Sequence, residues 1–334
     1  MPQAVLHATS RAIRAAATSV RHQLGRLWAR RRLRRTLAAC GALAFWLLMV
    51  YTILAFSIAA EIIHTERRPP VTTPAAADLP YEDVRFRSQD GLALQGWLVA
   101  PRLQGSPRRL IILLLDKAVG RGDPAVLRLI ETLSDAGLTV LVFDGRGSGV
   151  SEGQRYMLGY GERYDLLGAL EFARARGYQP ATTGVLGLGT GGATALLTAA
   201  ETTDIAALAV DSSYASLPDY IRATLRRRRL PSALLWGIHQ ATRLRYGPNL
   251  HHIVPEAAVA RMTPRPLLVI HGEADQDVPA EHARRLVEAA GPGGATELWI
   301  VPGAGHLQAF AQQQEDYLRR VVTFFLQAMG SGYE

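Results

Sequence analysis

The chain has 334 residues, of which 48% are apolar and 20% charged, a composition that builds a large core in one or two domains. Residues 1–60 contain nine arginines and no Asp or Glu, whereas residues 61–334 carry a net charge of −1. The basic character therefore belongs to the N-terminus, and nothing in the main domain indicates nucleic-acid binding. The only cysteine, Cys40, excludes disulfides and cysteine-ligated metal from the main domain.

The first predicted element is an apolar run of 24 uncharged residues over 37–60, LAACGALAFWLLMVYTILAFSIAA. About 20 apolar residues cross a bilayer, so residues 36–60 are predicted to form a transmembrane helix. The alternative is a cleaved signal peptide, which should have an apolar core of only about 7–15 residues and a small-residue cleavage site. The positive-inside rule places the basic residues 1–35 in the cytoplasm and the main domain outside. Membrane lipid is then an expected partner.

Two segments flank this run. Residues 11–28 place apolar side chains at helical intervals, with Arg11, Arg14 and Arg21 among them, which favours a helix lying on an anionic membrane surface. A solvated basic tail is the alternative, and the Arg-rich start also resembles a mitochondrial transit peptide. Residues 61–80 are predicted to be a linker, because RRPPVTTPAAADLP (67–80) has four prolines and no apolar periodicity. It should be an extended spacer that holds the domain near the membrane without packing it there.

From residue 81 to 330, strand and helix patterns alternate, which predicts a mostly parallel sheet flanked by helices. The expected strands are 84–87, 92–99, 110–115, 139–143, 183–188, 206–210, 267–271 and 298–301, the first two forming a hairpin. The expected helices are 124–136, 162–176, 191–200, 280–290 and 314–328, with a helical lid insertion at about 212–260.

Residues 187–192, GLGTGG, look like a nucleophile elbow, G-x-S-x-G, on a strand-to-helix turn. Gly189 stands at the serine position, and glycine supplies neither the hydroxyl nor the thiol that nucleophilic catalysis needs. Glycine reaches the positive φ of this turn without steric cost, so the fold should survive the change. Two alternatives remain. A shift of one residue makes Thr190 the nucleophile but puts Leu188 where a small residue is needed, and a Gly-rich turn also occurs without any function.

Four stretches together resemble the α/β-hydrolase superfamily, in particular its serine-aminopeptidase and acylglycerol-lipase-like branch. They are FDGRGSGVSEG (143–153), GLGTGGATAL (187–196), PRPLLVIHGEADQDVP (264–279) and GAGH (303–306). The resemblance implies an α/β-hydrolase fold with a helical lid, behind the N-terminal transmembrane helix. It also implies that Asp275 is the acid and His306 the general base, a pair in which the carboxylate fixes the imidazole tautomer. The structural alternative is a turn aspartate and a surface histidine.

Three positions depart from the family pattern. Gly189 replaces the nucleophile, Ser148 replaces a histidine of the R-G-H-G loop, and Asp116-Lys117 stand where His-Gly usually follows the strand that contributes to the oxyanion hole. Lys117 is the only lysine of the chain. We favour a solvent-exposed turn for Asp116-Lys117, the alternative being a charge that alters the pocket.

The lid itself contains two polar features. The run Arg226–Arg229 is interpreted as a solvated helix face, with lipid headgroups or an acidic partner as the sharper alternative. The histidines of the lid lack carboxylates at ligand spacing, so no metal is expected there.

The backbone N–H of Thr190 and the helix start at Gly191 are expected to point at the old oxyanion position. With Asp116 and Lys117 at its mouth, this leaves a small ligand site suited to a carboxylate or another anion. We therefore expect a membrane-anchored, catalytically impaired family member that binds a small ligand or protein partner outside the cytoplasm, without cofactor or metal.

Two other functions stay open. One is a slow carboxylic-ester or peptide hydrolase, in which the Asp275–His306 pair activates water or Thr190. The other is a structural element of a membrane assembly. If the acid–base pair is formed, the single change Gly189→Ser is expected to restore low esterase activity.

Overall fold

The computed structural model describes residues 3–64, 66–103, 105–247 and 249–330. The chain divides into two compact units, Met1–Ala55 and Phe56–Glu334. Helix α1 (Gln3–Ile63) makes up the described part of the first unit and contributes its last turns to the second. Its segment Arg30–Ile63 is long and apolar enough to cross a membrane, a test that a signal sequence near the N-terminus also passes. The amphipathic face expected over 11–28 lies outside the described side chains.

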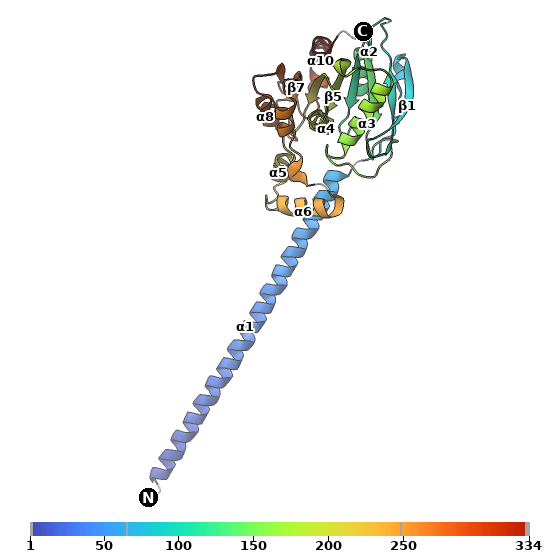
Figure 1. Cartoon of the computed structure of the whole chain (residues 1–334). Coiled ribbons are helices and arrows are strands. Elements are labelled where there is room, and N and C mark those ends of the chain that lie inside the picture. The colour runs from blue at the N-terminus through green and yellow to red at the C-terminus, as the bar shows by residue number, and fades with distance from the viewer. Residues whose placement is uncertain (1–2, 65, 104, 248, 331–334) are drawn as a thin grey trace. The chain divides into compact units, whose positions relative to one another are not determined.

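The second unit is built on one sheet (Figure 1). Its described strands follow the order β1-β2-β4-β3-β5-β6-β7-β8. β1, β2 and β4 pair antiparallel, and all other neighbours pair parallel. The bounds are Tyr81–Arg87 for β1, Ala93–Val99 for β2, Leu110–Leu114 for β3, Thr139–Asp144 for β4, Thr183–Leu188 for β5, Ala207–Asp211 for β6, Leu267–Gly272 for β7 and Thr296–Val301 for β8. The predicted strands are confirmed, because short apolar runs between turn residues suit strands buried on both faces.

Helices cover both faces of the sheet. Apolar side chains of α3, α4, α7 and α8 pack with one face, and those of α2 and α10 with the other. The bounds are Pro124–Asp135 for α2, Glu162–Ala175 for α3, Thr190–Ala199 for α4, Pro255–Met262 for α7, Glu281–Ala290 for α8, Ala309–Gln312 for α9 and Gln314–Ala328 for α10. Single 3₁₀ turns lie at Pro74–Ala77 (η1), Pro180–Thr182 (η2) and Leu250–His252 (η3). The five predicted helices are confirmed, while the single turn α9 was not predicted.

The predicted lid lies between β6 and β7. It consists of α5 (Leu217–Arg227), α6 (Leu234–Tyr246), η3 and α7. Arg228, the C-cap of α5, pairs with Glu61 in the last turns of α1, which belong to the same compact unit. The lid therefore contacts the point where the chain leaves α1.

The proline-rich segment packs on the domain and is not a free spacer. Arg67 donates from Nη1 to the Ser151 carbonyl at 2.8 Å, and Arg68 donates from Nη1 to the Ala118 carbonyl at 2.7 Å. Leu79 is buried in the core cluster that contains α2 and α10. The expectation of an extended spacer, drawn from the composition of this segment, is thus wrong. Proline content predicts an extended backbone. The guanidinium groups of Arg67 and Arg68, next to the prolines, have several N–H donors, and these bind carbonyl groups of the domain.

Candidate active site

The elbow forms at the expected residue. Gly189 lies between β5 and α4 with φ 53° and ψ −116°, while Thr190 is already the first residue of α4. A Cβ on Gly187 would lie 2.5 Å from Gly192 Cα, so strand and helix approach too closely for any side chain there. The geometry supports the register with Gly189 at the nucleophile position and opposes the shifted register with Thr190. The sharp turn between strand and helix is present, and Gly189 carries no side chain at it.

Asp275 and His306, the expected acid and base, are hydrogen-bonded to each other. His306 donates from Nδ1 to Asp275 Oδ2 at 2.8 Å. The other carboxylate oxygen, Asp275 Oδ1, accepts the backbone N–H groups of Asp277 at 2.9 Å and Val278 at 2.8 Å. Asp275 is therefore both a turn residue and the partner of the imidazole. The hydrogen bond at Nδ1 leaves Nε2 of His306 as the nitrogen available for proton transfer.

Several effects act on the pKa of His306. Burial lowers it, but the hydrogen bond to Asp275 and the negative charges of Asp275, Asp116 and Asp211 outweigh burial, so the pKa is raised above its ordinary value. A carboxylate near an imidazole favours the protonated form. His306 thus keeps its proton to higher pH than a free histidine does.

Asp116 occupies the space that a side chain at position 189 would need. A Cβ on Gly189 would lie 2.3 Å from Asp116 Oδ2. That oxygen accepts the Thr190 N–H at 3.0 Å and the Thr190 hydroxyl at 2.9 Å, while Oδ1 accepts the Ala118 N–H at 2.9 Å. The solvent-exposed turn favoured from the sequence is wrong, because Asp116 is buried.

Two further expectations change with this finding. The Thr190 N–H is not free for an external anion, because a carboxylate of the chain itself already holds it. The single change Gly189→Ser would push its Cβ into Asp116. It is therefore no longer expected to restore activity by itself.

A pocket of about 180 Å³ lies beside these groups. It is lined by Asp116, Lys117, Gly189, Thr190, Ser212, Tyr214, Tyr220 and His306, among others. The rings of Tyr214 and Tyr220 are stacked with centroids 5.7 Å apart. A smaller cavity of about 40 Å³ adjoins Asp116, Tyr156, Glu162 and Gly191. The acid–base pair therefore has access to a space that a small ligand can enter.

Comparison with known proteins places this geometry in a family. A model of the prolyl oligopeptidase family matches residues 126–332. The chain belongs to the prolyl oligopeptidase family. The expected α/β-hydrolase fold is confirmed with it, whereas the finer serine-aminopeptidase and acylglycerol-lipase-like branch is not.

Relatives of this prolyl oligopeptidase family member match most of its length. The uncharacterized protein YfhR of Escherichia coli K12 is 28% identical over 255 residues, covering 74% of this chain and 81% of YfhR. The uncharacterized protein Rv2307c of Mycobacterium tuberculosis is 29% identical over 253 residues, covering 73% and 82%. The solved esterase Pf2001 of Pyrococcus furiosus has a TM-score of 0.66 and 24% identity, covering 80% and 98%. The last likeness concerns the fold alone.

In this member of the prolyl oligopeptidase family, the Thr190 hydroxyl uses all of its hydrogen-bonding capacity. It donates to Asp116 Oδ2, and it accepts the Tyr156 hydroxyl at 2.6 Å and the Lys117 N–H at 3.2 Å. A threonine hydroxyl has one proton to donate and two lone pairs. No hydrogen-bonding capacity remains for activation by His306, which argues against Thr190 as a nucleophile.

Lys117 connects the elbow to the end of α1. Its Nζ donates to the Ile62 carbonyl at 3.1 Å, in the last turn of the helix. Burial lowers the pKa of Lys117, and the Asp116 charge opposes that effect without cancelling it. A cation at a helix C-terminus interacts favourably with the helix dipole. Lys117 is thus a pocket residue whose charge is directed at α1.

Gly191, the remaining predicted ligand contact, lies elsewhere. A Cβ on Gly191 would lie 2.5 Å from the Leu114 carbonyl oxygen. The glycine allows α4 to approach β3, and it does not line the pocket that contains His306. The close approach gives Gly191 a packing role at the helix start.

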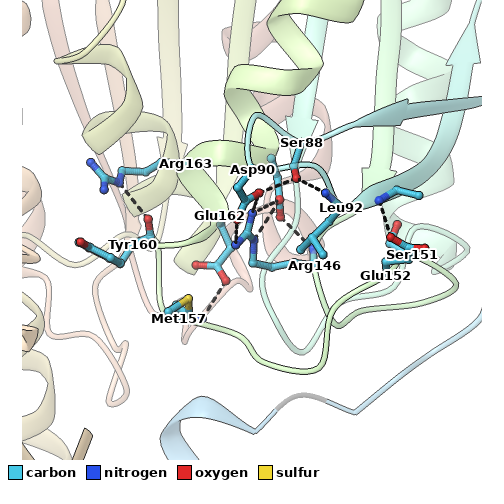
Figure 2. A network of polar contacts seen from close by, with 12 residues as sticks. Ser88, Asp90, Leu92, Arg146, Ser151, Glu152, Met157, Tyr160, Glu162 and Arg163 are labelled. Atoms are coloured by element: carbon cyan, nitrogen blue, oxygen red, sulfur yellow. Dashed lines mark hydrogen bonds and ion pairs between the residues drawn. The ribbon is translucent and has the colours of Figure 1, made fainter. Parts of the chain in front are cut away.

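The R-G-x-G loop is held by a buried ion-pair network that the sequence analysis missed (Figure 2). Arg146 Nη2 lies 2.8 Å from Asp165 Oδ1 and 2.7 Å from Asp90 Oδ1, and the Arg146 N–H donates to Asp165 Oδ2. Ser88 donates to Asp90 Oδ1 at 2.6 Å. The expected hairpin of strands 84–87 and 92–99, which contains Asp90 in its turn, was the only sequence signal for this contact, because Asp165 lies inside helix α3.

Proposed function

We propose that this protein is a membrane-anchored member of the prolyl oligopeptidase family that lacks the serine mechanism and binds a small ligand or protein partner outside the cytoplasm. The observation that carries the proposal is the Asp116 carboxylate, which fills the place of the nucleophile. The anchor is the apolar part of α1. The arginines that precede it favour a cytoplasmic N-terminus.

Two features of the elbow, Gly189 and the Asp116 carboxylate, oppose acyl transfer. Gly189 offers no nucleophile, and the negative oxygen of a tetrahedral intermediate would meet a carboxylate at the Thr190 N–H. Oxyanion stabilisation requires a donor aimed at the place where negative charge develops. A buried carboxylate at that place reverses the electrostatic effect of the donor.

The pocket supports binding of a small group. An engineered apolar cavity of about 150 Å³ holds a benzene molecule, and the pocket beside His306 measures about 180 Å³. Two stacked tyrosine rings and the imidazole offer an aromatic wall with polar atoms at its rim. A ligand with hydrogen-bond donors suits Asp116 better than the carboxylate expected from the sequence.

We predict that serine-directed phosphonate probes do not label the purified full-length protein. These probes need an activated nucleophile, and the Thr190 hydroxyl is the nearest one by sequence but is fully hydrogen-bonded. Intact-mass measurement after incubation should show no adduct. An adduct that peptide mapping places on Thr190 would contradict the proposal.

A second function has its own support in the Asp275–His306 pair, which could activate a water molecule for slow ester or peptide hydrolysis. Only the neutral imidazole accepts a proton, and the pKa of His306 is raised. Any residual hydrolysis should therefore increase with pH through a value above about 6.5, the ordinary histidine pKa.

This pH dependence has a matched control in Asp116→Asn. Because the Asp116 charge contributes to the raised pKa of His306, the inflection of the pH–rate profile should move to lower pH in that variant. His306→Ala should abolish the activity. A profile that is unchanged in both variants would exclude His306 as the base.

A further inference from the structure

One face of lid helix α6 exposes large apolar side chains. Trp236 is 67% exposed and Leu244 is 78% exposed. They lie eight residues apart, so their side chains point about 80° apart around the helix axis, within one broad stripe. Leu234, Ile238 and Ala241, which point to the other side of the helix from Trp236, are buried in the domain. An exposed tryptophan and an exposed leucine within one such stripe suit a surface that contacts more than water.

Exposed arginines lie on the same helix and at the end of α5, which packs against it. Arg226 and Arg229 at the end of α5 and Arg243 on α6 are exposed. Their neighbour Arg227 pairs with Asp277. A helix that combines Trp and Leu with flanking arginines fits the boundary between headgroups and acyl chains of an anionic membrane.

The same surface adjoins the end of α1. Arg228 Nη1 donates to Glu61 Oε2 at 2.7 Å, and Lys117 binds the Ile62 carbonyl. Ile58 and Ala59 are buried. α6 packs against α5, whose C-cap is Arg228, and both helices belong to the same compact unit as these last turns of α1. The lid therefore adjoins the place where the apolar run of the chain ends.

We propose that α6 lies in the headgroup region of an anionic bilayer, with Trp236 and Leu244 inserted and the nearby arginines at lipid phosphates. This inference rests on the proposed membrane anchor. It adds a second membrane contact, made by the lid, beside the pocket to which α5 contributes Tyr220. The lid helices would then be held by lipid on one side and by the domain on the other.

Fluorescence quenching in vesicles tests the proposal on the full chain. An environment-sensitive nitrobenzoxadiazole probe is attached to Trp236→Cys and, separately, to Leu244→Cys in a Cys40→Ser background. The control is Leu103→Cys, because Leu103 is 61% exposed but precedes β3, at the end of the sheet opposite the site. The proteins are reconstituted in phosphatidylcholine vesicles with phosphatidylglycerol and nitroxide-labelled lipid.

We expect the lipid nitroxides to quench the probes at positions 236 and 244 and to leave the probe at 103 unquenched. Omitting phosphatidylglycerol, or introducing Arg243→Gln, should reduce the quenching, whereas Arg128→Gln on α2 should not. Quenching at 236 and 244 no stronger than at 103 would overturn the proposal. Quenching that is equal with and without phosphatidylglycerol would overturn its electrostatic part.

A probe on native Cys40, attached in detergent before reconstitution, reports on the anchor separately. Cys40 lies inside the apolar run. If the Cys40 probe is quenched and the α6 probes are not, the anchor holds and the inference about α6 fails. If the Cys40 probe is not quenched either, the proposed anchor itself fails.

Discussion

The double change Gly189→Ser with Asp116→Ala should create a measurable esterase, whereas Gly189→Ser by itself should not. The new serine side chain needs the space that Asp116 Oδ2 now fills, 2.3 Å from the Cβ position. Removing the carboxylate takes away the two closest atoms and leaves only the residue 116 Cβ, 3.0 Å from the new side chain, which a small shift can accommodate. It also releases the Thr190 N–H, which Asp116 holds at 3.0 Å. Both requirements of acyl transfer, a nucleophile and an oxyanion donor, return together.

The size of the gain follows from the oxyanion donor. One such donor contributes about 10²–10³ in rate, so the double variant should exceed Gly189→Ser by about that factor on a small activated ester. The measurement is initial-rate hydrolysis of p-nitrophenyl acetate by the full chain in detergent. Phosphonate labelling at position 189 should appear in the double variant at the same time.

Controls separate chemistry from stability. Asp116→Ala without the serine should stay inactive, and adding His306→Ala to the double variant should remove the gain. A thermal unfolding curve for each variant shows whether it is folded. A folded double variant that neither hydrolyses the ester nor takes up phosphonate would mean that the Asp275–His306 pair is not directed at the elbow.

Much of this site is readable from the sequence because its determinants are local. The strand, turn and helix of the elbow follow from an apolar run and consecutive glycines, and the structure gives Gly189 the positive φ that the turn requires. Asp275 and His306 each follow a strand with a recognisable turn. The geometry of such motifs is determined by a few consecutive residues. Their sequence pattern and their places at the ends of strands therefore predict that Asp275 and His306 contact each other.

The position of the Asp116 side chain could not be predicted in this way. Its partner Thr190 lies 74 residues away in the chain, and no local pattern indicates whether an aspartate after a strand turns outward or into the elbow. The prediction of an extended spacer at residues 61–80 was wrong for a related reason, because proline content does not indicate which carbonyl groups Arg67 and Arg68 will bind. Long-range polar contacts depend on which backbone groups the finished fold leaves unpaired.

Arg146→Met should destabilise the second unit by about 3–5 kcal/mol, the usual cost of removing one partner from a buried ion pair. Arg146 is 5% exposed and Asp165 1% exposed. Without the guanidinium, Asp165 keeps a buried charge that only the backbone N–H of residue 146 still contacts. Methionine fills a similar volume, so the loss measures the charge more than the cavity. Urea unfolding followed by near-ultraviolet circular dichroism measures the difference.

The matched control is Arg128→Met, since Arg128 is 58% exposed and pairs with Glu131 on the surface of α2. An exposed pair contributes about 0–1 kcal/mol, so this variant should be nearly as stable as the parent. Equal stability of the two variants would contradict a structural role for the Arg146 network.

The pH dependence of the stability lost in Arg146→Met tests whether the buried charge of Asp165 causes that loss. Burial raises the pKa of Asp165, and the hydrogen bonds and charge of Arg146 lower it without cancelling the burial effect. In Arg146→Met the pKa must rise further, so the folded variant binds a proton at a pH where the unfolded chain does not. Stability then increases as pH falls wherever the folded state binds more protons. The deficit of Arg146→Met should therefore shrink as the pH falls through the folded-state pKa of Asp165, and a deficit that stays constant with pH would point to lost packing as its source.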